Sequence, residues 1–370
     1  MIETYDVGSM PFVGDFEKFS EGAIRLVSQS GRGTSGDSVE YFERKIVESF
    51  IDKLEAGIDV PNFPQVRDMN EMFFKMMSGI EKLKEGYFEA GIPSLRGGKA
   101  DIPEVLAIRR SSKEICERSG GRFRLKICIT GPYTLSSLFA YRDPQIYGRL
   151  SDVLSKIVEG NIFDDEYGGV TILAVDEPVF GLIDDPMIDV GSGGRENLLQ
   201  AWEKICHKAV EKGVETCLHL HSTADELFWR VASLRIVESH VGDALYSTDR
   251  TKKFLESNDM FLKASLCVSD FDKLIEKRVL SSPRETRKGD VAQRIGEVWR
   301  EIDRGKVSPD IFLESAESMG EKLREMTRRF GSERVLYAGP ECGLRGFPTY
   351  ECAVECLRRV SKATELVHKR

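Results

Sequence analysis

The chain contains Val335-Leu336-Tyr337-Ala338-Gly339-Pro340-Glu341-Cys342-Gly343-Leu344, in which an apolar run leads into a turn that carries a cysteine. The run Val335–Ala338 has the composition of a buried β-strand. Glycines on both sides of Cys342 indicate a tight turn rather than a packed interior. We therefore expect Cys342 to lie at the C-terminal end of a strand as a thiolate ligand, rather than to be a small buried hydrophobe.

Other apolar runs of strand length occur along the chain, and helical patterns separate most of them. The helical pattern is clear in Ser38–Glu55, where apolar residues recur every three to four positions, and Arg195–Lys212, Glu317–Phe330 and Tyr350–Val367 are similar. The predicted strands are Thr4–Ser9, Gly57–Val60, Leu125–Thr130, Thr171–Asp176, Glu215–His221, Leu234–Glu238, Phe261–Cys267 and Val335–Ala338.

Strands that alternate with helices pair in parallel through right-handed crossovers. Eight such strands predict an α/β fold in which residues 1–370 form a single (β/α)₈ TIM barrel, which we favour over an open doubly wound sheet. The segment 271–312 is rich in Lys, Arg, Glu and Ser, and predicts a charged, exposed insertion in this barrel.

Composition argues against several classes of protein. The 370 residues carry a formal net charge of −8, whereas binding to nucleic acid needs a basic surface. No apolar run approaches the length that spans a membrane, and the first residues do not have the pattern of a signal peptide. The eight cysteines lack the dense spacing of a secreted disulfide framework. We expect a cytoplasmic protein with no nucleic-acid or membrane partner.

Ionisable side chains follow several of the predicted strands. His219 and His221 are at positions i and i+2, so both project from one face of their strand, and the next strand ends in Glu238. Strand ends meet on one face of a barrel, where the active sites of this fold lie. Two imidazoles, a carboxylate and the Cys342 thiolate would make a four-ligand zinc set. The alternative is that the histidines are core residues satisfied by their neighbours.

Four other cysteines and one histidine are not among the four proposed ligands. Cys267, at the end of the seventh strand, is a spare candidate ligand, and His240 could support the ligands without binding the ion. Cys217 shares the strand face of the histidines but lies deeper, so we expect it in the core. Cys352 and Cys356 are four residues apart on a predicted helix, a spacing typical of packing.

Asp176 and Glu177 follow the apolar run Ile172–Val175. They could simply end the strand, but Asp176 would face the barrel mouth, and we favour a substrate contact. Zinc in such a site can hold a substrate thiol as a thiolate, or it can activate water. A cysteine ligand favours thiol alkylation, because thiolate donors reduce the Lewis acidity of zinc and keep a bound sulfur nucleophilic.

Taken in chain order, a set of short motifs resembles the catalytic barrel of cobalamin-independent methionine synthase, in the superfamily that includes uroporphyrinogen decarboxylase and the coenzyme M methyltransferases. Val7–Pro11 is similar to the family's Gly-Ser-Phe-Pro element, and Pro340–Leu344 to its Pro-Asp-Cys-Gly-Leu. The similarity runs nearly end to end and also includes Leu54–Val60, Arg67–Met69, Thr130–Thr134, Asp176–Pro178 and Glu238-Ser239.

The resemblance implies roles for individual residues. His219, Glu238 and Cys342 would be zinc ligands, and His221 would stand where the family has a ligand cysteine. Gly8 and Ser9 would hold the carboxylate of an amino-acid thiol. Asp176, with Glu177 beside it, would bind the ammonium group, which is sound electrostatics for a zwitterion.

Three departures from the family pattern bear on the substrate. His219-Leu220-His221 replaces a His-x-Cys, which makes the site more positive by one unit. The stretch Pro61–Arg67 has no acid where the family places a glutamate that binds homocysteine, so another thiol acceptor stays open. The family histidine proposed to handle a proton has no counterpart in Leu266–Asp270, where Asp270 could substitute as a catalytic residue beside Asp176.

The resemblance implies a zinc-dependent methyltransferase that moves a methyl group onto a thiol, with homocysteine as the expected acceptor and methionine as the product. Because we expect a single barrel, we prefer a methylated corrinoid, delivered by a corrinoid protein, to a folate or pterin as the donor. The alternatives are transfer to another small thiol such as coenzyme M, a non-enzymatic metal-binding partner of a corrinoid protein, and a decarboxylase that needs no metal.

Overall fold

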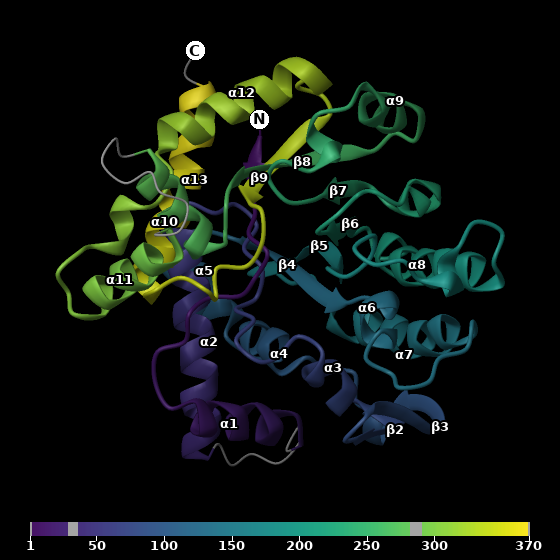
Figure 1. Cartoon of the computed structure of the whole chain (residues 1–370). Helices are drawn as coiled ribbons and strands as arrows, with labels where there is room; N and C mark the ends of the chain where they lie inside the picture. The colour runs from purple at the N-terminus through teal and green to yellow at the C-terminus, as the bar shows by residue number, and fades with distance from the viewer. Residues whose placement is uncertain (1, 29–35, 282–290, 369–370) are drawn as a thin grey trace.

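The computed structural model describes residues 2–28, 36–281 and 291–368 (Figure 1). Within these ranges one curved parallel sheet is built from β1 (Glu3–Thr4), β4 (Phe123–Thr130), β5 (Gly168–Glu177), β6 (Glu215–Leu220), β7 (Ile236–Glu238), β8 (Phe261–Cys267) and β9 (Val335–Pro340). Its strand order is β1-β9-β8-β7-β6-β5-β4, which is the order of a barrel opened beside β1 and β4. The fold is therefore of the TIM-barrel type, as the strand–helix alternation predicts.

The position of the second barrel strand holds an extended segment, residues 57–63, instead of a regular strand. The amide of Val60 donates to Thr4 O of β1 (2.9 Å), and the amide of Lys126 of β4 donates to Pro61 O (2.9 Å). The prediction of a strand at Gly57–Val60 is wrong in this respect, because Pro61 and Pro64 have no N–H with which to extend a ladder. The segment still bonds to both β1 and β4, and so closes the ring.

Helices cover the outside of the sheet in Figure 1. The predicted helical patterns are confirmed by α2 (Asp37–Glu55), α8 (Gly193–Val210), α12 (Ala316–Phe330) and α13 (Tyr350–His368). The apolar stripe of α2 is buried through Val39, Phe42, Ile46 and Phe50. The other helices are α1 (Phe16–Ser28), α3 (Glu71–Lys75), α4 (Pro103–Arg110), α5 (Ser112–Ser119), α6 (Pro132–Ser136), α7 (Ile146–Asn161), α9 (Asp249–Ser257), α10 (Phe271–Leu280) and α11 (Val291–Asp303).

Two connections depart from a plain barrel. The charged segment 271–312 contains α10 and α11, which bury Phe271, Leu274 and Val298, while most of the charged side chains of α10 face outward; its residues 282–290 lie outside the described ranges. A hairpin of β2 (Met77–Leu83) and β3 (Gly86–Leu95), for which no strands were predicted, stands apart from the main sheet (Figure 1).

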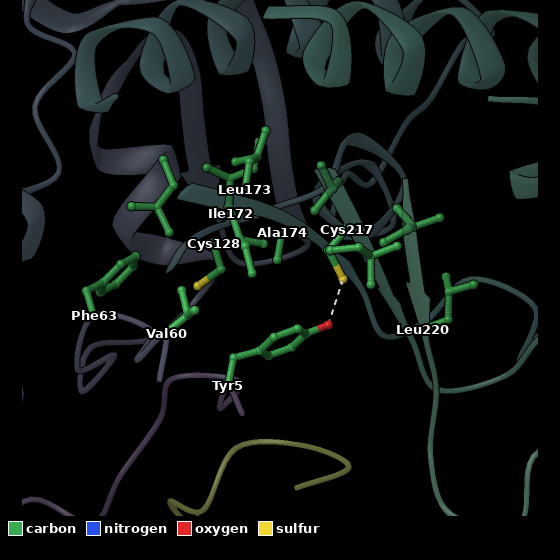
Figure 2. Close-up of a cluster of buried hydrophobic side chains, with 14 of the residues drawn as sticks. Tyr5, Val60, Phe63, Cys128, Ile172, Leu173, Ala174, Cys217 and Leu220 are labelled. Atoms are coloured by element: carbon green, nitrogen blue, oxygen red, sulfur yellow. Dashed lines mark hydrogen bonds between the residues drawn. The ribbon is translucent and has the colours of Figure 1, made fainter. Parts of the chain in front are cut away.

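The barrel interior mixes apolar and charged side chains. Figure 2 shows Tyr5 reaching from the chain after β1 toward Cys217 of β6, and the Tyr5 hydroxyl lies 3.4 Å from the Cys217 sulfur. The Nζ atoms of Lys126 and Lys263 lie 4.6 and 5.5 Å from the centre of the Tyr5 ring. Among the described helices, none is both long and apolar enough to cross a membrane.

Candidate functional site

Three imidazoles and a thiol meet at the C-terminal end of the barrel. His219 is in β6, His221 directly follows it, His240 lies two residues after β7, and Cys342 lies two residues after β9. One ligand atom from each of these four residues lies within 4.8 Å of the others. The Sγ atom of Cys342 is 3.6 Å from Nε2 of His221. The structure thus brings together three of the four predicted zinc ligands, and adds His240.

The fourth predicted ligand, Glu238, lies beneath this cluster. It is the register partner of His219 across the β6–β7 pair, and its Oε1 is 3.2 Å from Nδ1 of His219. Two buried lysines also face it: Nζ of Lys263 is 2.7 Å from Oε2, and Nζ of Lys126 is 3.9 Å from Oε1. Glu238 therefore contacts the outer nitrogen of one imidazole and two ammonium groups.

Glu341, for which no role was predicted, braces the turn that carries Cys342. It is buried, and its two carboxylate oxygens accept hydrogen bonds from the amides of Val241 (2.8 Å) and Ser269 (2.9 Å). Because these amides follow β7 and β8, Glu341 ties three strand ends together. These bonds fix the backbone next to two members of the cluster, His240 and Cys342.

The electrostatics of the cluster favour a thiolate. Burial alone would raise the pKa of Cys342, but its contacts with His219, His221 and His240 outweigh burial and lower that pKa well below 9.0. Burial alone would also lower the pKa of His219, but Glu238 and Cys342 raise it to about 10. A thiolate among imidazoles is a donor set that suits a divalent ion of intermediate softness.

Asp176 lies at the barrel mouth, as predicted. It is the register partner of His219 across the β5–β6 pair, it is 3% exposed, and its Oδ1 has no hydrogen bond among the described residues. Burial is the main reason that the pKa of Asp176 rises to about 6. An unsatisfied buried carboxylate is costly, so a cationic ligand group would be stabilising here.

Glu177 and Asp270 have other contacts than those predicted for them. The carboxylate of Glu177 accepts from the amides of Tyr133 (2.9 Å) and Thr134 (2.6 Å) and from the indole of Trp202 (2.8 Å), so it caps α6 and its two oxygens are occupied. Asp270 is exposed and caps α10 by accepting from the amide of Lys273. A carboxylate followed by a helix is the usual N-cap pattern, which explains Asp270. Glu177 instead reaches the first turn of α6 from the end of the neighbouring strand β5.

Gly8 and Ser9 lie beside the cysteine turn. The amide of Leu344 donates to Ser9 O (2.8 Å), and a Cβ on Gly343 would collide with the Ser9 hydroxyl. Gly8 has φ +130°, and a Cβ there would collide with the Asn62 amide, so only glycine fits. The predicted substrate-binding pair therefore adjoins Cys342.

The other cysteines lie away from the cluster. Cys267, the spare candidate, has its sulfur 3.6 Å from that of Cys356 on α13. Cys352 and Cys356 are buried, as their helical spacing predicts. Cys217 is in the barrel interior, where its thiol is 3.6 Å from Oε1 of Glu238.

No protein-family model matches the chain. A methionine synthase from Sulfolobus acidocaldarius is 24% identical over 386 aligned residues, which cover 100% of this chain and 93% of the relative. A 5-methyltetrahydropteroyltriglutamate–homocysteine methyltransferase from Mycobacterium tuberculosis is 21% identical over 96% of this chain. The chain spans only 42% of that second protein.

Solved structures agree on the fold. A B12-independent methionine synthase from a Shewanella species, in complex with selenomethionine, superposes with a TM-score of 0.60 and 15% identity, covering 100% of this chain and 98% of that one. The chain is similar to the cobalamin-independent methionine synthases. A putative member from Listeria monocytogenes superposes with a TM-score of 0.57 and 13% identity, covering 99% of both chains. At these identities the two structures establish the barrel fold and nothing finer.

Proposed function

We propose that this chain transfers a methyl group to the sulfur of homocysteine and so forms methionine. The observation that carries the proposal is the juxtaposition of the histidine–cysteine cluster with the buried Asp176, whose Oδ1 has no hydrogen bond among the described residues, at one barrel mouth. A thiol that also carries an ammonium group matches both features. The relatives named above are methionine synthases and homocysteine methyltransferases.

We propose zinc as the ion of the cluster, held by His219, His221 and Cys342 with one further ligand. Nε2 of His219 is buried and has no hydrogen bond among the described residues, so a ligand-type nitrogen is left without a partner. One sulfur with several imidazole donors is a set that zinc accepts. When bound, zinc keeps a thiol deprotonated at neutral pH.

The residues around the cluster position the acceptor. The Asp176 carboxylate would pair with the substrate ammonium group. The Gly8-Ser9 segment, which lies beside the turn that carries Cys342, would bind the substrate carboxylate. A new S–C bond forms as the bond between the methyl carbon and the donor breaks, and a proton returns to the demethylated donor atom. Glu341 would keep the strand ends in place during this exchange.

For the methyl donor we propose a methylated pterin. The mycobacterial relative is named for methyltetrahydropteroyltriglutamate, and both solved structures are named B12-independent. The corrinoid donor and corrinoid protein partner that we expected from the sequence therefore have no support from these relatives. This chain spans less than half of the mycobacterial relative, so the donor named for that protein has to be tested for this one by assay.

One assay separates the candidate donors and acceptors. Zinc-loaded protein is incubated with homocysteine or coenzyme M, and with either methyltetrahydropteroyltriglutamate or methylcobalamin, and the methylated thiol is quantified. We expect methionine from homocysteine and the pterin, and much less product from coenzyme M, which has no ammonium group for Asp176. Methylation of coenzyme M in preference to homocysteine would contradict the acceptor, and turnover with methylcobalamin alone would contradict the donor. Stable zinc without any turnover would favour a non-enzymatic metal-binding protein.

A further inference from the structure

The two central strands present their ligand-type side chains in two layers. His219 and Glu238 are register partners and form the deeper layer. His221 and His240 each lie two residues farther along, so they project on the same side and form the upper layer. The rings of His221 and His240 are 3.9 Å apart between centroids, and Cys342 lies in this upper layer, 3.6 Å from Nε2 of His221.

Glu238 is committed to the deeper layer. It is fully buried, and so are the Lys263 and Lys126 ammonium groups that face it at 2.7 and 3.9 Å. The Cys217 thiol also donates to its Oε1. Moving this carboxylate up to a metal ion would leave two buried positive charges without their counter-ion, which is strongly destabilising.

His240, unlike Glu238, belongs to the upper layer. Its Nε2 is buried and has no hydrogen bond among the described residues, and it belongs to the set whose ligand atoms all lie within 4.8 Å of one another. Zinc–nitrogen and zinc–sulfur bonds of about 2.0 to 2.3 Å place tetrahedral donors about 3.3 to 3.8 Å apart, so small side-chain rotations suffice. Glu238 is not a member of this set.

We infer that His240 completes the zinc coordination together with His219, His221 and Cys342, and that Glu238 is a positioning residue that orients His219 through Nδ1 and neutralises Lys126 and Lys263. This assignment rests on the proposed function only for the identity of the ion. A carboxylate at the outer nitrogen of a metal-binding histidine is a common arrangement, because it fixes the ring and its tautomer. The resemblance to the methionine synthases implied Glu238 as the ligand instead.

Replacing Glu238 by His240 in the ligand set changes the charge of the zinc site. Three neutral imidazoles and one thiolate give the zinc centre a charge of +1, whereas replacing one imidazole by a carboxylate gives zero. A more positive centre binds a thiolate more readily. Because four protein ligands fill a tetrahedral site, a substrate thiolate would have to displace one of them or raise the coordination number to five. The more positive centre also makes the missing second-strand acid less important for recognition, because the centre itself attracts the substrate sulfur.

The coordination is tested on the zinc-loaded, full-length chain by zinc X-ray absorption spectroscopy and by competition with a chromophoric chelator. We expect three imidazoles and one sulfur in the unmodified protein. His240→Ala should lose one imidazole and weaken zinc binding by more than the roughly 10- to 100-fold that removal of a supporting residue costs. His207→Ala is the matched control, because His207 lies on the surface of α8 with its side chain 59% exposed.

Glu238→Gln separates a ligand from a positioning residue. We expect this variant to bind one zinc ion per chain through the same number of imidazoles as the unmodified protein, and to have a lower free energy of unfolding. Two results would overturn the assignment: a spectrum of the unmodified protein with two imidazoles and an oxygen ligand, or unchanged zinc affinity in His240→Ala. Neither measurement requires Glu238→Gln to fold. A three-imidazole site without methyl transfer would remove the proposed function and leave the coordination standing.

Discussion

At the scale of single residues, Cys342 is the group on which the zinc hypothesis depends most directly. It is the one sulfur in the cluster of ligand-type residues found in the described ranges, and three imidazoles lower the pKa of its thiol. We expect Cys342→Ser to lose most of its bound zinc and its methyl transfer, because a neutral hydroxyl is a poor zinc ligand compared with a thiolate. Metal analysis by mass spectrometry measures the first effect.

The control for this substitution is Cys116→Ser, which changes a free, partly exposed cysteine on α5. Both variants should keep the far-ultraviolet circular dichroism of the unmodified protein. Zinc content that is unchanged in Cys342→Ser would remove Cys342 from the ligands.

Where one strand period was enough, the sequence predicted which side chains lie together at the barrel mouth. His219, His221 and Cys342 follow from strand ends and the i, i+2 rule. The same rule applied from Glu238 reaches His240, so this residue could have been found. The contact of Lys126 with Glu238 could not, because Lys126 lies on β4, far away in the sequence and not beside β7 in the sheet. Lys263 lies on β8, which pairs with β7.

At the scale of elements, the Asp-Glu-Pro motif has two functions that the sequence does not separate. Asp176 faces the mouth, while Glu177 caps α6 and bonds the indole of Trp202 on α8. A Cβ on Gly131 would collide with the Glu177 carboxylate, so the Thr-Gly-Pro motif belongs to the same structural cap. Burial outweighs the three N–H donors and raises the pKa of Glu177 from its ordinary value of 4.5 to about 7.

This gives a pH prediction for Glu177→Gln. Because its folded-state pKa is raised, the folded protein binds more protons at this carboxyl than the unfolded chain does between pH 4.5 and 7. The contribution of Glu177 to stability is therefore full below pH 4.5 and falls as pH rises through 7. A shift of this size corresponds to about 3 kcal/mol. The free energy of unfolding of the unmodified protein, relative to that of Glu177→Gln, should fall by up to this amount between pH 4.5 and 8.

Urea unfolding of both proteins across this pH range measures the difference, and groups that titrate alike in both proteins cancel. A constant gap between the two stability curves would show that Glu177 stays ionised in the fold. If the free energy of unfolding of the unmodified protein rose with pH relative to that of Glu177→Gln, the change would have the wrong sign for a raised pKa.

Element boundaries were predictable where the pattern of burial was regular, as in β8, which is buried almost throughout, and in α2, which has one buried stripe. They were not predictable where the backbone pairs irregularly. The apolar run Gly57–Val60 has the composition of a strand, but the prolines beside it limit it to isolated bonds with β1 and β4. The β2–β3 hairpin has few buried residues, so its alternation was too weak to indicate strands.

At the scale of the whole molecule, a buried ion pair lies where the ring of strands closes. Lys53 of α2 is fully buried, and its ammonium group contacts Asp6 Oδ2 (2.7 Å), Gly8 O (2.9 Å) and Asn62 O (3.0 Å). The other oxygen of Asp6 accepts from the Asn62 amide (2.7 Å). One lysine thus joins the chain after β1 to the extended segment that replaces the second strand, next to Gly8 and the proposed substrate site.

Replacing Lys53 by methionine keeps much of the side-chain volume but leaves Asp6 as a buried charge without its partner. We expect Lys53→Met to lower the free energy of unfolding by about 3 to 5 kcal/mol, and Lys156→Met, at an exposed position of α7, to change it by about 0.5 kcal/mol or less. Adding Asp6→Asn to Lys53→Met should restore part of the loss, because the orphaned charge is removed. If the double variant were as unstable as the sum of the two single variants, the pair would not be coupled, and closure of the ring would have to depend on the backbone bonds of residues 57–63 alone.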